Sequence, residues 1–140
     1  MAKGKGTRAV HAGVEPCEAT GAIMTPIYQT STYVQDGVGN HKGYEYSRTL
    51  NPTRHALEKA LAELEGAKYG LAFASGLAAM DNLIKILKPG DEVISTDDLY
   101  GGSYRLFTTV FANFGIKFHF VDLSDSDALR SVLNENTKLV

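Results

Sequence analysis

The chain has a single cysteine, Cys17, and lacks long hydrophobic or basic runs. One cysteine excludes an internal disulfide framework and suits a reducing compartment. No apolar run approaches the length needed to cross a membrane, and the N-terminus lacks the apolar core of a secretory signal. The formal net charge is only -2 at pH 7, which makes nucleic acid and anionic membranes poor candidate partners. We therefore expect a cytoplasmic protein that binds neither.

Several ligand-binding patterns are missing as well. The sequence has no P-loop lysine and no G-x-G-x-x-G, so neither a plain nucleotide nor a dinucleotide is the obvious ligand. The scattered histidines show no metal-ligand spacing, and we expect no metal site; they are His11, His41, His55 and His119. What remains is the composition of an ordinary globular domain, with 44% hydrophobic and 21% charged residues in 140.

Residues 1–50 differ from the rest of the chain. They are rich in Gly, Thr, Gln and Tyr, show no sustained helical period, and are interrupted by Pro16, Pro26 and the glycine-containing segment 37–43. An arm of this length without regular elements is unusual inside a compact domain. It either packs on another subunit or is disordered. We divide the chain into this arm, residues 1–50, and the first part of an α/β domain, residues 51–140.

Regular elements are expected from Asn51 onward, where an N-cap residue precedes a proline at the first helical position. Apolar periodicity predicts helices over 51–66, 76–87, 102–114 and 126–133. The intervening segments predict strands over 69–74, 92–96, 117–123 and 137–140. This alternation is typical of a mostly parallel sheet covered on both faces. Because no turn signal follows the last strand, we expect the chain to be the N-terminal piece of a longer protein.

Three groups in this pattern could serve a phosphorylated, flat ligand. Ser75, Gly76 and Leu77 lie where a predicted strand runs into a helix of small residues, so free backbone N–H groups at the helix start could bind a phosphate. Tyr100 lies just past another strand end, before two glycines, where its ring could stack on a heteroaromatic ligand or simply pack in the core.

The third group is Tyr46 with Arg48. These residues alternate, so an extended segment would direct both side chains to the same side. A phenol and a guanidinium placed together can bind a phosphate through charge-assisted hydrogen bonds. A surface arginine beside a packed tyrosine is the simpler alternative, and Arg54 is explained as a residue of the first helical turn. Together the three groups suit a planar aromatic phosphate.

The same segments resemble the Cys/Met-metabolism family of pyridoxal-phosphate enzymes, which includes cystathionine γ-synthase, cystathionine γ-lyase, cystathionine β-lyase and methionine γ-lyase. The motifs that carry the resemblance are YSR at 46–48, NPTR at 51–54, AFASGLAA at 72–79 and DDLYGG at 97–102. The resemblance implies the N-terminal part of an aspartate-aminotransferase-like large domain (fold type I) after an irregular arm. It also implies a homotetramer made of two active dimers.

The resemblance further implies a role for each candidate residue. Gly76 and Leu77 would offer backbone N–H groups to the phosphate of pyridoxal 5'-phosphate, while Tyr46 and Arg48 would reach that phosphate from the neighbouring subunit. Tyr100 would stack on the pyridine ring and, as a catalytic residue, take part in proton handling. In this family the Schiff-base lysine, the aspartate that pairs with the pyridine nitrogen and the arginine for the substrate carboxylate lie further downstream. We therefore expect the 140 residues alone to be inactive.

The implied activity is trans-sulfuration of a small amino-acid substrate, by elimination or replacement at Cγ with the cofactor as electron sink. Methionine γ-lyases typically carry cysteine directly after the Tyr-Gly pair, where this chain has Gly102. This favours cystathionine γ-synthase or γ-lyase, with cystathionine β-lyase, methionine γ-lyase and O-acylhomoserine sulfhydrylase as alternatives. An alternative of another class is a non-catalytic phosphate-binding or oligomerisation module, if 140 residues are the whole product.

Overall fold

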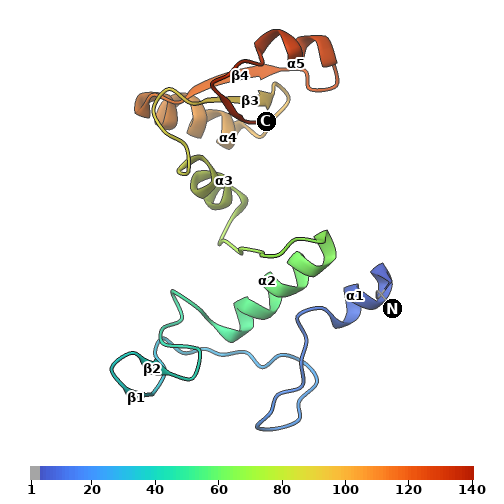
Figure 1. Cartoon of the computed structure of the whole chain (residues 1–140), viewed down its shortest axis with the longest axis vertical. Coiled ribbons are helices and arrows are strands. Elements are labelled where there is room, and N and C mark those ends of the chain that lie inside the picture. The colour runs from blue at the N-terminus through green and yellow to red at the C-terminus, as the bar shows by residue number, and fades with distance from the viewer. Residues whose placement is uncertain (1–3) are drawn as a thin grey trace. The chain divides into compact units, whose positions relative to one another are not determined.

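The computed structural model describes residues 4–140, which divide into two compact units between Ala72 and Phe73 (Figure 1). The N-terminal unit contains two helices and a small hairpin. Its elements are α1 (Lys5–His11), β1 (Gln35–Gly37), β2 (Asn40–His41) and α2 (Pro52–Glu65). The C-terminal unit is α/β, as predicted. None of the helices in residues 4–140 is long and apolar enough to cross a membrane.

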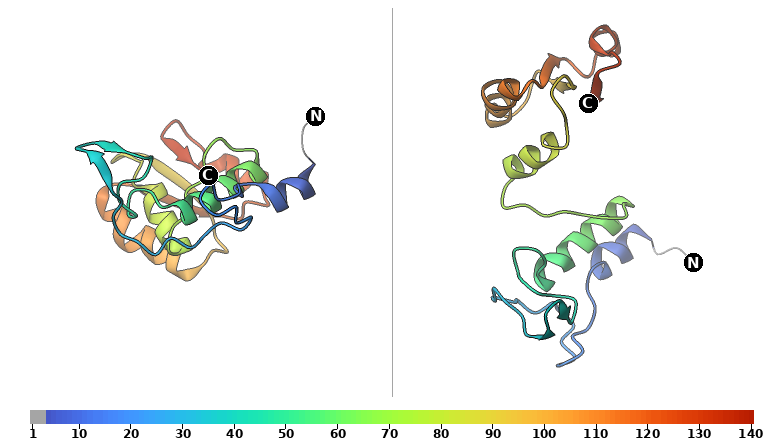
Figure 2. Two further views of the ribbon diagram at one scale, coloured as in Figure 1. Left: turned by 90° about the horizontal axis from the view of Figure 1, so that it is seen from below. Right: turned by 60° about the vertical axis from the view of Figure 1, so that its left-hand side comes forward.

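The prediction that residues 1–50 hold no regular elements is wrong for α1 and for the hairpin. Helix α1 has only seven residues, too few for a periodic pattern to show and too few for a stable helix by itself. It lies against α2 (Figure 2), where Arg8 Nη1 donates a hydrogen bond of 2.9 Å to the carbonyl of Glu63. Packing on α2 therefore supplies the order that the local sequence does not signal.

Helix α2 confirms its predicted caps. The side chain of Asn51 accepts hydrogen bonds from the N–H groups of Thr53 and Arg54, at 2.9 and 3.5 Å, and Pro52 follows at the first helical position. Gly66 ends the helix with a left-handed φ of 69°. These local signals fix the helix at both ends.

The buried strand predicted over 69–74 is wrong. The segment has no strand partner among the described residues, and the side chains of Tyr69 and Leu71 are exposed. It instead lies against α2, because Ala72 N donates to Glu58 Oε1 at 3.0 Å and a β-carbon on Gly70 would stand 2.4 Å from the Glu58 carbonyl oxygen. An apolar run becomes a strand only when a neighbouring strand accepts its backbone hydrogen bonds, and sequence pattern does not show that neighbour.

A parallel three-stranded sheet forms the centre of the C-terminal unit. Its order is β4-β3-β5, with both outer strands parallel to the central one, which confirms the predicted parallel sheet. The strands are β3 (Glu92–Thr96), β4 (Lys117–Val121) and β5 (Thr137–Leu139). The strands predicted over 92–96, 117–123 and 137–140 are therefore present, the last two slightly shorter than expected.

Helical segments of this unit pack with the sheet around a small apolar core. They are α3 (Gly76–Ile84), α4 (Gly101–Arg105), the π-helical turn η1 (Leu106–Val110), the 3₁₀ turn η2 (Phe111–Phe114) and α5 (Ser126–Val132) (Figure 1). The buried core cluster consists of Ile84, Val93, Phe107, Phe111 and Ile116. The Phe107 ring stacks on Phe118 of β4 with 4.7 Å between centroids, so the helical segment after Tyr100 is held on the sheet by aromatic packing.

Helix α3 ends three residues earlier than predicted, and the helix predicted over 102–114 changes its winding along its length. It begins as α-helix, widens to π-helix at Leu106 and tightens to 3₁₀ at Phe111. Gly115 then ends it with φ of 80°. The wide turn accompanies burial of both Phe107 and Phe111 in the core, a requirement that apolar spacing alone does not reveal.

Candidate cofactor site

The start of α3 presents two backbone N–H groups that find no acceptor within the described part of the chain. Ser75 caps this helix, since its Oγ accepts from Ala78 N at 3.1 Å and its carbonyl accepts from Ala79 N at 3.1 Å. The N–H groups of Gly76 and Leu77 come before these bonds, at the positive end of the helix. A β-carbon on Gly76 would meet nothing within 4 Å, so the backbone here faces open space. The arrangement can accept an anion such as a phosphate.

Tyr100 lies beyond the carboxyl end of β3, immediately before α4. Its carbonyl accepts hydrogen bonds from Ser103 N at 2.9 Å and Tyr104 N at 3.2 Å, which fixes its backbone to the first turn of that helix. Its side chain is 73% exposed. The ring folds back over Gly102, where a β-carbon would stand 2.3 Å from ring atom Cε1. The core-packing alternative for Tyr100 is therefore wrong, because a face of this ring is available to a flat ligand.

The loop after β4 lies at the same edge of the sheet as Tyr100's loop, since β3 and β4 are parallel and in register up to Thr96 and Val121. Asp97 N donates to the Val121 carbonyl at 3.0 Å. Asp122 Oδ1 accepts from both the Oγ and the N–H of Ser124, at 2.6 and 2.8 Å, and these bonds lower the pKa of Asp122. This carboxylate is thus engaged in shaping its own turn.

In the N-terminal unit, the structure brings Tyr46 and Arg48 together. The guanidinium carbon of Arg48 lies 4.9 Å from the centroid of the Tyr46 ring, within the range of a cation–π interaction. The predicted extended geometry is wrong: residues 47–49 form a turn in which Thr49 N and Leu50 N donate to the Tyr46 carbonyl, at 3.1 and 3.0 Å. Arg48 is exposed, and no carboxylate pairs with it anywhere in residues 4–140.

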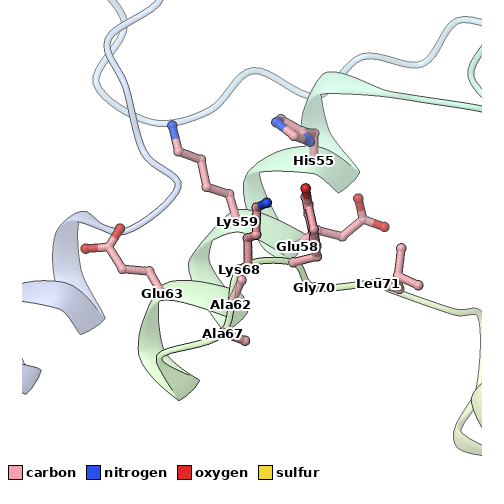
Figure 3. Close-up of a pocket in the computed structure, with 10 residues that line it drawn as sticks. His55, Glu58, Lys59, Ala62, Glu63, Ala67, Lys68, Gly70 and Leu71 are labelled. Carbon is pink, nitrogen blue, oxygen red and sulfur yellow. The ribbon is translucent and has the colours of Figure 1, made fainter.

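A cavity of about 780 Å³ lies elsewhere in the N-terminal unit, between α2 and the segment that follows it (Figure 3). None of the predicted site residues lines it. Two of its charged groups already have partners, because Lys59 pairs with Glu15 and Glu58 pairs with Arg54. Groups already engaged in this way offer little to a new ligand, and we assign no chemistry to this cavity.

Two arrangements were missed by reasoning from sequence. The guanidinium of Arg54 holds the turn that carries Arg48, although Arg54 reads as an ordinary residue of a first helical turn. At the other edge of the sheet, the buried Glu92 carboxylate accepts from His119 Nε2, Lys117 Nζ and Asn134 Nδ2, at 2.5, 3.3 and 2.8 Å. Neither arrangement can be recognised from a sequence motif, because each depends on residues that are brought together by the fold.

Considered unit by unit, the candidate groups suit a phosphorylated aromatic ligand better than a metal ion. Backbone N–H groups and an unpaired guanidinium are suited to phosphate oxygens, and an exposed tyrosine ring is suited to a flat heterocycle. Residues 4–140 contain no group of three His, Cys, Asp or Glu side chains placed to hold a metal ion.

Comparisons with known proteins agree with this chemistry. Residues 6–140 match the family described as Cys/Met metabolism PLP-dependent enzyme. The chain is 56% identical over its whole length to a probable cystathionine γ-synthase of Herpetosiphon aurantiacus, covering 44% of that protein. It is 50% identical over 96% of its length to a cystathionine β-lyase of Coxiella burnetii, covering 35% of that protein.

Among solved structures, the crystal structure of metB from Corynebacterium glutamicum is similar with a TM-score of 0.93 and 47% sequence identity. The match covers 99% of this chain and 37% of that one. The chain thus spans less than half the length of these relatives. The family match over nearly every residue and the high identity together show that this chain belongs to the Cys/Met-metabolism family of pyridoxal-phosphate-dependent enzymes.

Proposed function

We propose that the protein carrying this chain is a trans-sulfuration enzyme of the cystathionine γ-synthase or γ-lyase type, acting on a small amino-acid substrate by replacement or elimination at Cγ. Family membership carries this proposal, and the exposed Tyr100 ring, the free N–H groups of α3 and the unpaired Arg48 support it. Cystathionine β-lyase is the second candidate, because the Coxiella burnetii relative of that name is nearly as similar as the γ-synthase.

Each candidate residue has a proposed task in holding the cofactor. Gly76 and Leu77 donate backbone hydrogen bonds to its phosphate at the positive end of α3. Arg48 and the Tyr46 hydroxyl add charge-assisted hydrogen bonds to the same phosphate, from a neighbouring copy of the chain. Tyr100 stacks on the pyridine ring and so fixes its plane. Pyridoxal phosphate, when bound, supplies an electron sink for negative charge that develops on the substrate carbons.

Tyr100 also has a proposed part in proton transfer. Its phenol is exposed, and a hydroxyl positioned near the substrate's Cα and Cβ could hold or accept a proton there. The ring of one residue would thereby orient the cofactor and place a proton-transferring oxygen near the substrate. We assign Tyr100 the catalytic role in this part of the chain.

The assembly is proposed to be a homo-oligomer, a tetramer of two active dimers in a reducing, cytoplasmic setting. The arm over residues 1–50 would then lie at the subunit interface and deliver Tyr46 and Arg48 to the neighbour's site. In residues 4–50 only Ala12 is buried, which leaves a large surface of the arm for such a contact. The domain that begins at residue 51 would hold the cofactor.

Cofactor binding and product analysis test the proposal directly. The whole protein, freed of cofactor and titrated with pyridoxal phosphate, should gain the visible absorbance of the bound cofactor and retain the cofactor covalently after borohydride reduction. Arg48→Ala and Tyr46→Phe should weaken binding, while Arg130→Ala, an exposed arginine on α5, should not. Unchanged affinity in both site variants would remove the phosphate assignment.

The products separate the candidate activities. Cleavage of the Cγ–S bond of cystathionine releases cysteine, 2-oxobutanoate and ammonia, whereas cleavage of the Cβ–S bond releases homocysteine, pyruvate and ammonia. A synthase instead joins cysteine to an activated homoserine. Pyruvate as the only oxo-acid product, with no condensation, would favour the β-lyase. The 140 residues alone are expected to release neither oxo acid above the rate of free cofactor.

A further inference from the structure

One side chain of α2 holds the turn that carries Arg48. Arg54 Nη1 donates to the carbonyl of Ser47 at 3.1 Å, and Arg54 Nη2 donates to the carbonyl of Thr49 at 2.7 Å. These two carbonyls lie on either side of Arg48 in the chain. The planar guanidinium therefore bridges the carbonyl groups of the residues before and after Arg48, with one nitrogen on each. Arg48 is the residue that we propose to bind the phosphate.

The guanidinium of Arg54 is itself fixed by a neighbour one turn further along α2. Its Nε lies 3.3 Å from Glu58 Oε1, and the Glu58 side chain is only 12% exposed. The same carboxylate oxygen accepts from Ala72 N at 3.0 Å. Arg54, at 32% side-chain exposure, is thus held by a carboxylate that is largely enclosed and is already oriented by a backbone N–H. An ion pair in such a setting is screened less than one on the open surface.

The turn has additional supports, but none of them ties both sides of Arg48 to α2. Asn51 Nδ2 donates to Ser47 Oγ at 3.1 Å, and Thr49 Oγ1 donates to the Tyr46 carbonyl at 2.7 Å. The first bond links one end of the turn to the N-cap residue of α2, and the second closes the turn on itself across Arg48. The Arg54 guanidinium joins both ends of the turn to the helix, through one hydrogen bond on each side of Arg48.

We propose that Arg54 is a positioning residue for phosphate binding: by holding the Ser47 and Thr49 carbonyls, it fixes Arg48 over Tyr46 in the geometry that receives the cofactor phosphate. This inference rests on the proposed function of Tyr46 and Arg48. Arg54 itself touches no phosphate. Its guanidinium binds backbone carbonyls and Glu58. It affects phosphate binding only by positioning Arg48.

The test compares two ligands that differ only in the phosphate. Dissociation constants for pyridoxal phosphate and for pyridoxal are measured on the whole cofactor-free protein, in the parent and in Arg54→Ala, Arg54→Lys, Arg48→Ala and Arg130→Ala. A single charge-assisted contact that is lost or misplaced weakens binding by about tenfold. Arg54→Ala should therefore lower affinity for pyridoxal phosphate by about tenfold while leaving affinity for pyridoxal unchanged. Arg54→Lys should recover little, because an ammonium cannot span two carbonyls.

The control is Arg130→Ala, which removes an exposed arginine that pairs with Asp127 within α5. This variant should leave both affinities unchanged. A preserved phosphate preference in Arg54→Ala, together with its loss in Arg48→Ala, would overturn the role of Arg54 and leave the phosphate site intact. A preserved preference in Arg48→Ala would instead overturn the phosphate site itself. An equal loss of affinity for both ligands in Arg54→Ala would show a general folding defect and also overturn the positioning role.

Discussion

The ring of Tyr100 occupies the space that a side chain at Gly102 would need, since a β-carbon at Gly102 would stand 2.3 Å from Cε1 and 3.0 Å from Cζ of the ring. Gly102 is buried, whereas the ring above it is exposed. The absence of a side chain at position 102 therefore sets the position of the ring that we propose to stack on the cofactor.

This contact makes Gly102→Ala a test of the ring's placement. The new methyl group must push the Tyr100 ring away, because contacts under 3.0 Å are not tolerated. We expect cofactor affinity and turnover to fall while the free energy of unfolding changes little, since alanine favours the helix. The matched control is Gly101→Ala, the preceding residue of α4, where a β-carbon would meet nothing within 4 Å. Equal affinities in the two variants would refute the role of Gly102.

Ser75 allows the capping of α3 to be separated from anion binding. Ser75→Ala removes the acceptor for Ala78 N and should lower the free energy of unfolding by about 1 kcal/mol, measured by urea denaturation. Ser75→Asp should keep the cap, because aspartate is an equally good N-cap residue. Its negative charge beside the Gly76 and Leu77 N–H groups should nevertheless repel a phosphate, so this variant should be stable but bind pyridoxal phosphate weakly. Parent-like binding by Ser75→Asp would argue against a phosphate at this helix start.

Glu92 predicts a pH dependence of stability. Hydrogen bonds from Asn134, His119 and Lys117 lower the pKa of Glu92 to about 2 from an ordinary 4.5. Because the folded-state pKa lies below the unfolded one, this carboxylate stabilises the fold above pH 4.5, and its contribution is lost as the pH falls from 4.5 toward 2.

We expect Glu92→Gln to unfold at lower urea concentration than the parent at pH 7, with the difference shrinking as the pH approaches 2. Asp127→Asn serves as the control, since Asp127 is an exposed partner of Arg130 and such surface pairs contribute little. A gap between parent and Glu92→Gln that stays constant from about pH 7 down to about pH 2 would contradict the assignment, because the carboxylate should lose its contribution below pH 4.5.

Gly13 and Gly21 separate a steric requirement from a conformational one. Both have left-handed backbones, with φ of 70° and 72°, but a β-carbon would meet the Ala56 carbonyl oxygen at 2.1 Å only at Gly13. Gly21→Ala should cost about 1 kcal/mol of stability from backbone strain. Gly13→Ala should cost roughly 3 kcal/mol or more, because it also forces the arm away from α2. Similar unfolding midpoints for the two variants would show that the arm's contact with α2 contributes little.

Local signals predicted much of this structure, and tertiary contacts decided the remainder. Asn51, Pro52 and Gly66 act on neighbours within a few residues, so the ends of α2 could be predicted from sequence. The alternation of helices and strands likewise predicted the parallel sheet. The segment 69–74 failed as a strand because pairing depends on a partner that an apolar run does not identify.

In the candidate site, too, some features could be predicted from local sequence, whereas others depend on tertiary contacts. Tyr46 and Arg48 were paired correctly but for the wrong geometric reason, because the turn that joins them depends on Arg54 from a separate helix. Gly76, Leu77 and Tyr100 could be placed at element ends from sequence pattern alone. The contact of the Tyr100 ring with Gly102 could not, since it is set by a side-chain rotation that no spacing encodes.

The dependence of the N-terminal arm on α2 has a consequence for folding during synthesis. The arm emerges first, yet its tertiary hydrogen bonds reach forward along the chain, from Arg8 to Glu63 and from Tyr28 to Thr53. With only Ala12 buried in residues 4–50, the arm has no core of its own on which to collapse. We therefore expect the arm to dock only after α2 has been synthesised, so that translation sets the earliest time at which it can dock.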